Sequence, residues 1–133
     1  PSPASERLLF EGVDPRARIR ELKPLVTNEQ LAAIQKAVKQ VSASDVLLDY
    51  VQRLVEFTRS DSRFSYGLSP RGALALLRAA KAWALIHNRS YLVPEDIQTV
   101  LPAVVGHRIR GTGHGNDSDA LVRHLRDSVN VLL

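Results

Sequence analysis

Residues 67–86 read GLSPRGALALLRAAKAWALI, and this stretch decides the fold class. Twelve of the fourteen residues from 73 to 86 are apolar, which is too many for a helix that exposes one whole side to water. Ser69 and Pro70 are residue types favoured at an N-cap and at the first helical position. The pattern therefore predicts a long helix that ends near His87 and lies in the middle of a helical bundle.

Helical patterns recur on both sides of this stretch. The predicted helices run from Asp14 to about Leu22, from Thr27 through Val41, from Ser44 to about Arg59, from Pro94 through Val104 and around Leu121 and Leu125. Tyr91–Val93 is a short extended piece. The sequence therefore predicts an all-α fold, a small helical bundle with at most one tiny two-stranded β pairing.

Several local expectations accompany these helices. Thr27 and Gln30 form a capping-box pattern, and the helix they open carries an apolar stripe formed by Leu31, Ile34, Val38 and Val41. Asp49 and Arg53 have the i,i+4 spacing of a helical ion pair. Pro102 is expected to kink or end its helix.

The connections also have distinct compositions. Residues 60–67 form a predicted polar loop that contains Phe64 and Tyr66, and Asn88 suits a left-handed helix stop. Residues 111–119 are rich in glycine and predict a mobile loop.

The composition limits the possible functions. The 133 residues fit one domain, and 44% apolar with 24% charged residues argues against both a disordered tail and a membrane protein. The chain has no cysteine, which excludes disulfides and fits a reducing, cytoplasmic compartment. It also has no methionine, so we expect an excised piece of a longer protein. The net charge of +4 allows an anionic partner without requiring one.

Familiar catalytic motifs are absent from the sequence. It contains no GxxxxGK[ST] phosphate loop, no GxGxxG after a strand and no HExxH. The four histidines do not share a helical ligand spacing, so no metal site is predicted. The chain alone is not expected to be an enzyme.

Arg71 is the one chemically unusual residue of the predicted central helix. It lies in the first turn, where a cation opposes the helix dipole at a cost of about 0.3–1 kcal/mol. An anion at this helix end would reverse the sign, because the free N–H groups and the guanidinium would both attract it. The alternative is a solvated basic face, since Arg78 and Lys81 follow on the same side.

Three segments together carry a family resemblance. Residues 67–84, the segment NRSYLVPEDI at 88–97 and His107-Arg108-Ile109 occur in the order found in the C-terminal lid of MoxR-type AAA+ ATPases, which the chain resembles. Magnesium-chelatase ATPase subunits have a similar lid. The resemblance is strongest from Thr58-Arg59 to Ile109, looser from Leu25 to Tyr50, and fades after Arg110.

The resemblance implies a domain organisation and roles for single residues. Residues 1–13 would be a linker from a missing upstream AAA+ core, residues 14–110 the helical lid, and residues 111–133 a flexible loop and C-terminal helix packed on it. Arg71 matches the sensor-2 arginine, which contacts the terminal phosphate of ATP. Leu68 and Leu74 would contact the apolar side of the nucleotide.

Other matched positions imply less. Arg89 and Arg108 would serve structure or subunit contacts. Asn88, Gly72 and Val93 depart from the glycine, alanine and threonine that are common in the family, and Gly72 costs about 1 kcal/mol of helix propensity.

The resemblance further implies a chaperone-like remodelling or complex-assembly motor as the parent protein. Its cofactor would be ATP, with Mg²⁺ bound by the missing core domain. Its partners would be its own core, the neighbouring subunits of a homo-oligomeric ring, expected to be a hexamer, and a von Willebrand factor A-domain protein. No membrane span is expected.

Two alternatives remain open at this point. A basic DNA-binding module would meet phosphates with one of two groups of cations, and a helical interaction domain would act without nucleotide. The two groups are Arg18, Arg20, Lys23, Lys36 and Lys39, or Arg108, Arg110, Arg123 and Arg126. No recognition-helix pattern favours DNA, so nucleic acid is not the preferred partner.

Overall fold

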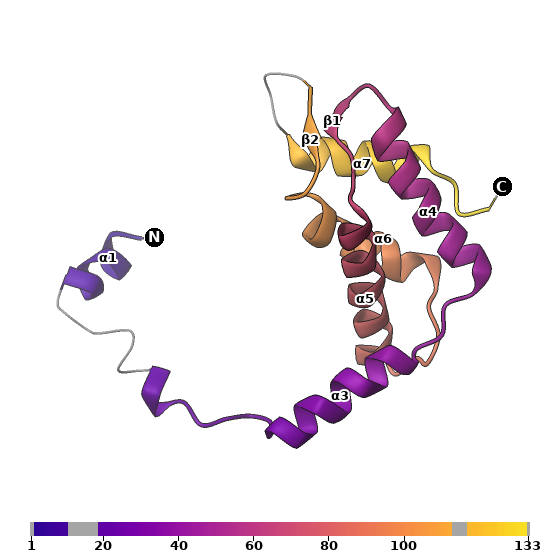
Figure 1. The fold of residues 1–133 in the computed structure, drawn as a ribbon. Coiled ribbons are helices and arrows are strands. Elements are labelled where there is room, and N and C mark those ends of the chain that lie inside the picture. Colours follow the sequence, from indigo (N-terminus) through magenta and orange to yellow (C-terminus); the bar gives the residue numbers. More distant parts are fainter. Residues whose placement is uncertain (1, 11–18, 113–116, 133) are drawn as a thin grey trace. The chain divides into compact units, whose positions relative to one another are not determined.

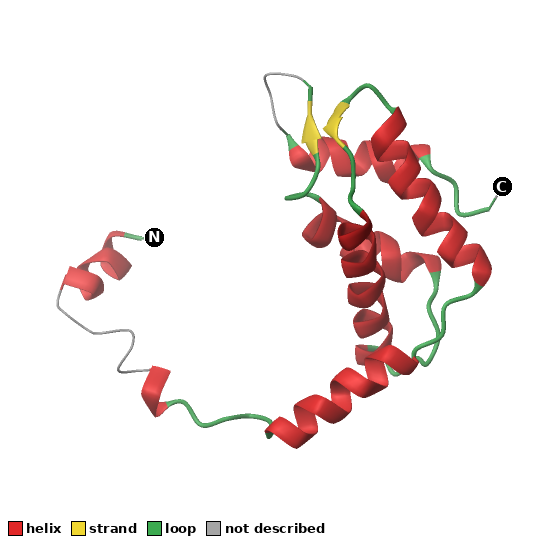
Figure 2. Ribbon diagram, in the orientation of Figure 1, coloured by secondary structure: helices red, strands yellow, loops and turns green. Residues whose placement is uncertain are grey.

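The computed structural model describes residues 2–10, 19–112 and 117–132, and it confirms an all-α fold with one small sheet (Figures 1 and 2). The helices are α1 (Pro3–Phe10), α3 (Asn28–Gln40), α4 (Asp45–Ser60), α5 (Pro70–Ile86), α6 (Pro94–Val105) and α7 (Ser118–Ser128). The strands β1 (Phe64–Tyr66) and β2 (Arg110–Gly111) pair antiparallel. The chain divides into two units, residues 1–32 and 33–133.

Helix α1 begins at Pro3, so the segment 1–13, which was expected to be a linker, contains a helix. Residues 19–21 are helical, in agreement with a helix end near Leu22, while the expected start at Asp14 lies outside the described residues. The capping box is confirmed. The Gln30 N–H donates to Thr27 Oγ1 over 3.2 Å, and the Thr27 N–H donates to Gln30 Oε1 over 2.8 Å.

The second unit has a single apolar core to which four helices contribute. Helix α5 packs most extensively on α6, and α4 and α7 contact each other and complete the bundle (Figure 1). The largest fully buried apolar side chains are Tyr50, Leu54, Leu68, Leu76, Ile97, Leu101, Val105 and Leu125. Burial of this apolar area stabilises the unit by roughly 25 cal/mol per Å².

Helix α5 is less covered than its composition predicts. Its fully buried residues are spaced four apart and are mostly small: Gly72, Leu76, Ala80 and Ala84. Such a row lets a neighbouring helix approach closely. Leu74 and Ile86, in contrast, are 53% and 72% exposed. The expectation that other helices surround α5 is therefore wrong at Leu74 and Ile86.

The β pairing lies in segments predicted to be loops. Phe64 pairs with Gly111 and Tyr66 with Arg110, so β1 falls inside the predicted loop 60–67. The extended piece at residues 91–93 forms only an isolated bridge, between Ser42 and Tyr91. Gly111 is therefore part of a strand, and residues 113–116 of the predicted mobile loop lie outside the described residues.

The connection between α5 and α6 follows the sequence closely. Asn88 has a φ of 56°, the left-handed conformation predicted for a helix stop. Helix α6 continues through Pro102 to Val105, so this proline does not end the helix. Within the described ranges, no helix is both long enough and apolar enough to cross a membrane.

Candidate functional site

The start of α5 is defined by its N-cap. Ser69 has extended backbone angles, φ −75° and ψ 159°, and its hydroxyl accepts a hydrogen bond from the Gly72 N–H over 3.2 Å. Pro70 occupies the first helical position and has no N–H to satisfy. This arrangement fixes Arg71 at the second position of the first turn.

Two consecutive residues of α4 hold the loop that leads into α5. The Thr58 hydroxyl donates to the Val55 carbonyl over 2.7 Å and accepts from the Leu68 N–H over 2.8 Å. The Arg59 guanidinium donates to the Leu68 carbonyl through Nε at 3.2 Å and Nη2 at 2.9 Å. Both peptide groups that flank the Leu68 side chain are therefore bound to α4.

Close packing also restricts this loop at Gly67. A Cβ on Gly67 would lie 2.8 Å from the Thr58 carbonyl oxygen and 2.6 Å from Cγ of Arg59. Sequence reasoning placed Thr58 and Arg59 at the edge of the resemblance but gave them no role. No periodicity marks them, because they act through hydrogen bonds to a residue nine or ten positions away.

Arg71 has an exposed side chain, and its own backbone N–H is an unused hydrogen-bond donor among the described residues. The first turn of α5 contains no acidic residue, and Arg71 forms no ion pair within the described part of the chain. The Arg71 N–H likewise has no acceptor among the described residues. This helix end therefore offers a guanidinium and a backbone donor to an anion.

A second arginine reaches the same turn of α5. A Cβ on Gly72 would lie 3.5 Å from Cδ of Arg108, so the stem of Arg108 passes beside the first turn. Its Nη1 donates to the Val104 carbonyl and contacts His107. The same Cβ would lie only 2.5 Å from Cδ1 of the buried Leu68. Glycine at this position therefore makes room for a core side chain.

The two leucines near Arg71 differ in their surroundings. Leu68 is 1% exposed and belongs to the core, so it offers almost no surface to a ligand in this structure. Leu74 is 53% exposed and lies one helical turn after Arg71. Of the two expected apolar contacts, only Leu74 is accessible.

Arg89 lies beyond the opposite end of α5 and forms an ion pair. Its Nη1 donates to Asp96 Oδ2 over 2.6 Å, and its Nη2 binds the other carboxylate oxygen. Asp96 also accepts from the Val93 N–H over 2.9 Å, which caps α6. The hydrogen bonds from Arg89 are the main cause that lowers the pKa of Asp96, and burial opposes them. This arrangement stabilises the α5–α6 connection.

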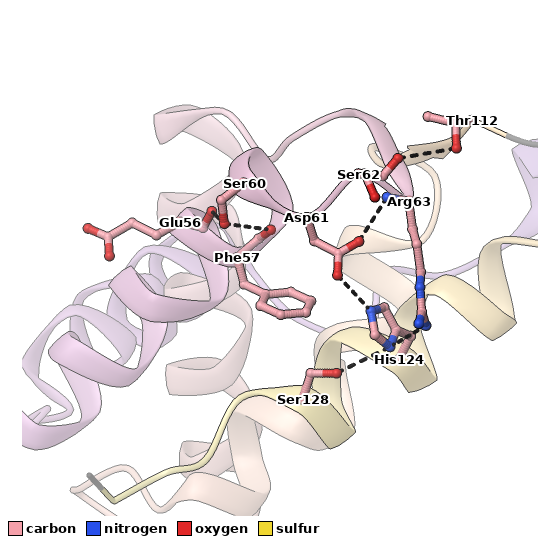
Figure 3. Close-up of polar contacts among 9 residues, drawn as sticks. All are labelled: Glu56, Phe57, Ser60, Asp61, Ser62, Arg63, Thr112, His124 and Ser128. Carbon is pink, nitrogen blue, oxygen red and sulfur yellow. Dashed lines mark hydrogen bonds and ion pairs between the residues drawn. The ribbon is translucent and has the colours of Figure 1, made fainter.

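His124 of α7 contacts Asp61 and Arg63 in the turn after α4, and we call these three residues the His124 cluster (Figure 3). His124 Nε2 lies 3.1 Å from Asp61 Oδ2, and Arg63 Nη1 lies 3.0 Å from His124 Nδ1. A guanidinium can only donate, so Arg63 donates to Nδ1 and Nε2 faces the Asp61 carboxylate. The Arg63 backbone N–H and then His124 lower the pKa of Asp61.

Several of the cations considered for DNA binding already have partners. Arg126 pairs with Asp127 at 2.8 Å and Arg123 with Asp117 at 3.9 Å. Arg108 binds a backbone carbonyl, and Arg18 lies outside the described residues. These contacts leave fewer free charges for a phosphate backbone.

Comparison with known families gives this architecture a name. Residues 56–125, more than half of the chain, match the family described as the AAA lid domain. The chain belongs to the AAA lid domain family. The matched segment of the lid domain begins in the last turns of α4, includes α5 with Arg71, and ends in α7.

Similar proteins extend this assignment. The lid domain is 35% identical over 117 residues to the YeaC protein of Bacillus subtilis, covering 85% of this chain and 37% of that protein. It is 31% identical over 120 residues to Chaperone MoxR1 of Mycobacterium tuberculosis, covering 82% of this chain and 31% of that one. The lid domain thus spans about a third of the length of these relatives.

A solved structure has the same fold. A proposed ATPase from Cytophaga hutchinsonii superimposes with a TM-score of 0.74 at 29% identity, over 81% of this chain and 37% of that one. The lid domain thus shares its fold with this proposed ATPase and about a third of its aligned residues with Chaperone MoxR1.

Proposed function

We propose that Arg71 is the sensor-2 arginine of this lid domain and contacts the terminal phosphate of ATP held by a preceding AAA+ core. The observation that carries the proposal is the exposed guanidinium at the α5 N-terminus. The first turn contains no carboxylate, and the Arg71 N–H has no acceptor among the residues that the structure describes. A cation is unfavourable there unless an anion lies close by. A triphosphate satisfies this requirement.

The chemistry of the arginine suits a phosphoryl group. A guanidinium stays charged at all physiological pH values and can donate to two phosphate oxygens at once. It would stabilise the negative charge that develops on the transferring group. Mg²⁺ would be held by the core domain, and Leu74 would supply an apolar contact beside the nucleotide.

Leu68 has a supporting role in this proposal. Its side chain is buried in the core, while its N–H and carbonyl groups are bound to Thr58 and Arg59. These bonds fix the position at which α5 begins. Leu68 would therefore orient Arg71 rather than contact ATP.

The proposed parent protein is a ring-forming motor in the cytoplasm. We infer that the lid contacts its own core and neighbouring subunits of a homo-oligomeric ring, with a hexamer as the expected form. A relative named Chaperone MoxR1 supports a chaperone-like remodelling or assembly activity. A von Willebrand factor A-domain protein is the partner class that we propose for it.

Substitution of Arg71 in the full-length protein tests the phosphate contact. We expect Arg71→Ala to lower the ATPase kcat/KM at least about tenfold, which corresponds to about 1.4 kcal/mol of transition-state stabilisation. Arg71→Lys should recover part of the loss, because lysine keeps the charge but not the paired donors. The measurement is steady-state hydrolysis, with circular dichroism to check the fold.

Arg123→Ala provides the control, because Arg123 is an exposed arginine on α7 that belongs neither to the proposed nucleotide contact nor to the first turn of α5. Its ATPase activity should stay within about twofold of the wild type. Equal activity of the Arg71→Ala variant and the wild type would remove Arg71 from the nucleotide site.

A further inference from the structure

An open groove of about 500 Å³ lies between α3 and α5, within the second unit. Its apolar part is formed by Ile34, Val38 and Ala82. Ile34 is 48% exposed, and α3 has no fully buried residue. Of the predicted apolar stripe, Leu31 and Ile34 are exposed, Val38 is half-buried and Val41 is buried.

The polar lining of the groove, which we call its rim, consists of three cations and the neutral Gln35. Lys39, Arg78 and Lys81 line it, and no carboxylate does. Residues 33–40 and 70–86, which form both walls, contain five basic residues and no acidic one. None of the three rim cations forms an ion pair with any residue that the structure describes.

We propose that this groove binds a short amphipathic helix of a partner protein, whose apolar face is flanked by Asp and Glu residues. The apolar floor would take two or three aliphatic side chains, which is how amphipathic helices fill hydrophobic grooves. The carboxylates would neutralise the three rim cations, which increases both the association rate and the specificity.

The composition of the groove argues against other occupants. Nucleic acid bases stack on aromatic side chains, and the lining of this groove contains none. In a symmetric dimer formed through this groove, the three cations of one copy would face the same three cations of the other copy and repel them. An amphipathic acidic helix would cover the apolar floor with its aliphatic side chains and pair its carboxylates with the rim cations.

The test measures binding of two helical peptide probes to the full-length protein by fluorescence anisotropy. One labelled probe carries leucines at i, i+3, i+4 and i+7 with glutamates beside them, and the other has lysines in place of the glutamates. We expect the glutamate probe to bind at least about tenfold more tightly. Lys39→Glu, Lys81→Glu and Ile34→Asp should each weaken its binding at least about fivefold.

Lys36→Glu is the matched control, because Lys36 is exposed on α3, does not line the groove and changes the net charge by the same amount as Lys39→Glu. Its affinity for the glutamate probe should stay within about twofold of the wild type. An equal loss in Lys36→Glu and Lys39→Glu would reduce the effect to net charge and overturn the proposal.

Two further outcomes would also overturn it. Equal binding of the two probes would show that the rim does not select acidic partners. Failure of the glutamate probe to bind would overturn the proposal, and a smaller assembly of the Ile34→Asp variant in sedimentation would then assign the groove to a second copy of the chain. The Arg71 variants are not part of this test, so the nucleotide site and the groove can fail independently.

Discussion

At the scale of single residues, Thr58 links the end of α4 to the start of α5. Its buried hydroxyl donates to Val55 and accepts from Leu68, so Thr58→Val should leave the Leu68 N–H without a partner. We expect the free energy of unfolding to fall by about 1–3 kcal/mol in chemical denaturation. Thr99→Val is the control, since Thr99 also donates to a carbonyl of its own helix but is exposed, and a change below about 0.5 kcal/mol is expected.

Asp96 makes the stability depend on pH. Its pKa is lowered in the folded state, so its contribution is complete above the ordinary pKa of an aspartate, near 3.9, and is lost as the pH falls through the lower folded pKa. At pH 7 the free energy of unfolding of the wild type should exceed that of the Asp96→Asn variant by about 1.5–3 kcal/mol. Denaturation across the acid range should show this gap closing below about pH 4, and a constant gap would contradict the assignment.

Sequence reasoning at this scale succeeded for local bonds and failed for distant ones. The Thr27–Gln30 capping box and the left-handed Asn88 depend on neighbours within a few residues, and both are confirmed. The predicted pair of Arg53 with Asp49 is wrong, because Arg53 donates instead to the carbonyls of residues 130 and 131. The spacing of two residues on a helix does not reveal a better acceptor 77 positions away.

At the scale of elements, the buried row of small residues on α5 determines how closely its neighbours approach. Ala80 is fully buried in this row, so Ala80→Leu should overpack the core and lower the free energy of unfolding by about 1–3 kcal/mol. Ala103→Leu on the exposed side of α6 should change it by less than about 0.5 kcal/mol. Thermal or chemical denaturation of both variants distinguishes packing from helix propensity.

The sequence predicted where helices begin better than it predicted which of their residues are buried. The start of α5 at Ser69-Pro70 depends on local preferences and was predicted correctly. Composition alone could not show that Leu74 and Ile86 remain exposed, because an apolar residue can equally face a core or a surface that awaits a partner. The strand pairing of Phe64 with Gly111 was missed because it joins two short, distant segments without alternating patterns.

At the scale of the whole molecule, the His124 cluster holds α7 against the turn that follows α4. His124→Ala removes the contacts to Asp61 and Arg63, so the amides of α7 should exchange with solvent at least about tenfold faster. Hydrogen exchange measured by mass spectrometry or NMR would follow residues 118–128. Arg123→Ala on the same helix is exposed and should leave the exchange rates nearly unchanged.

Arg59 connects the proposed nucleotide contact to the body of the second unit. Its guanidinium and the neighbouring Thr58 hydroxyl grip the carbonyl and N–H groups of Leu68, three residues before Arg71. Only three residues and these hydrogen bonds therefore separate Arg71 from α4. If Arg71 binds the terminal phosphate as proposed, these three hydrogen bonds would transmit a displacement of the α5 N-terminus to α4.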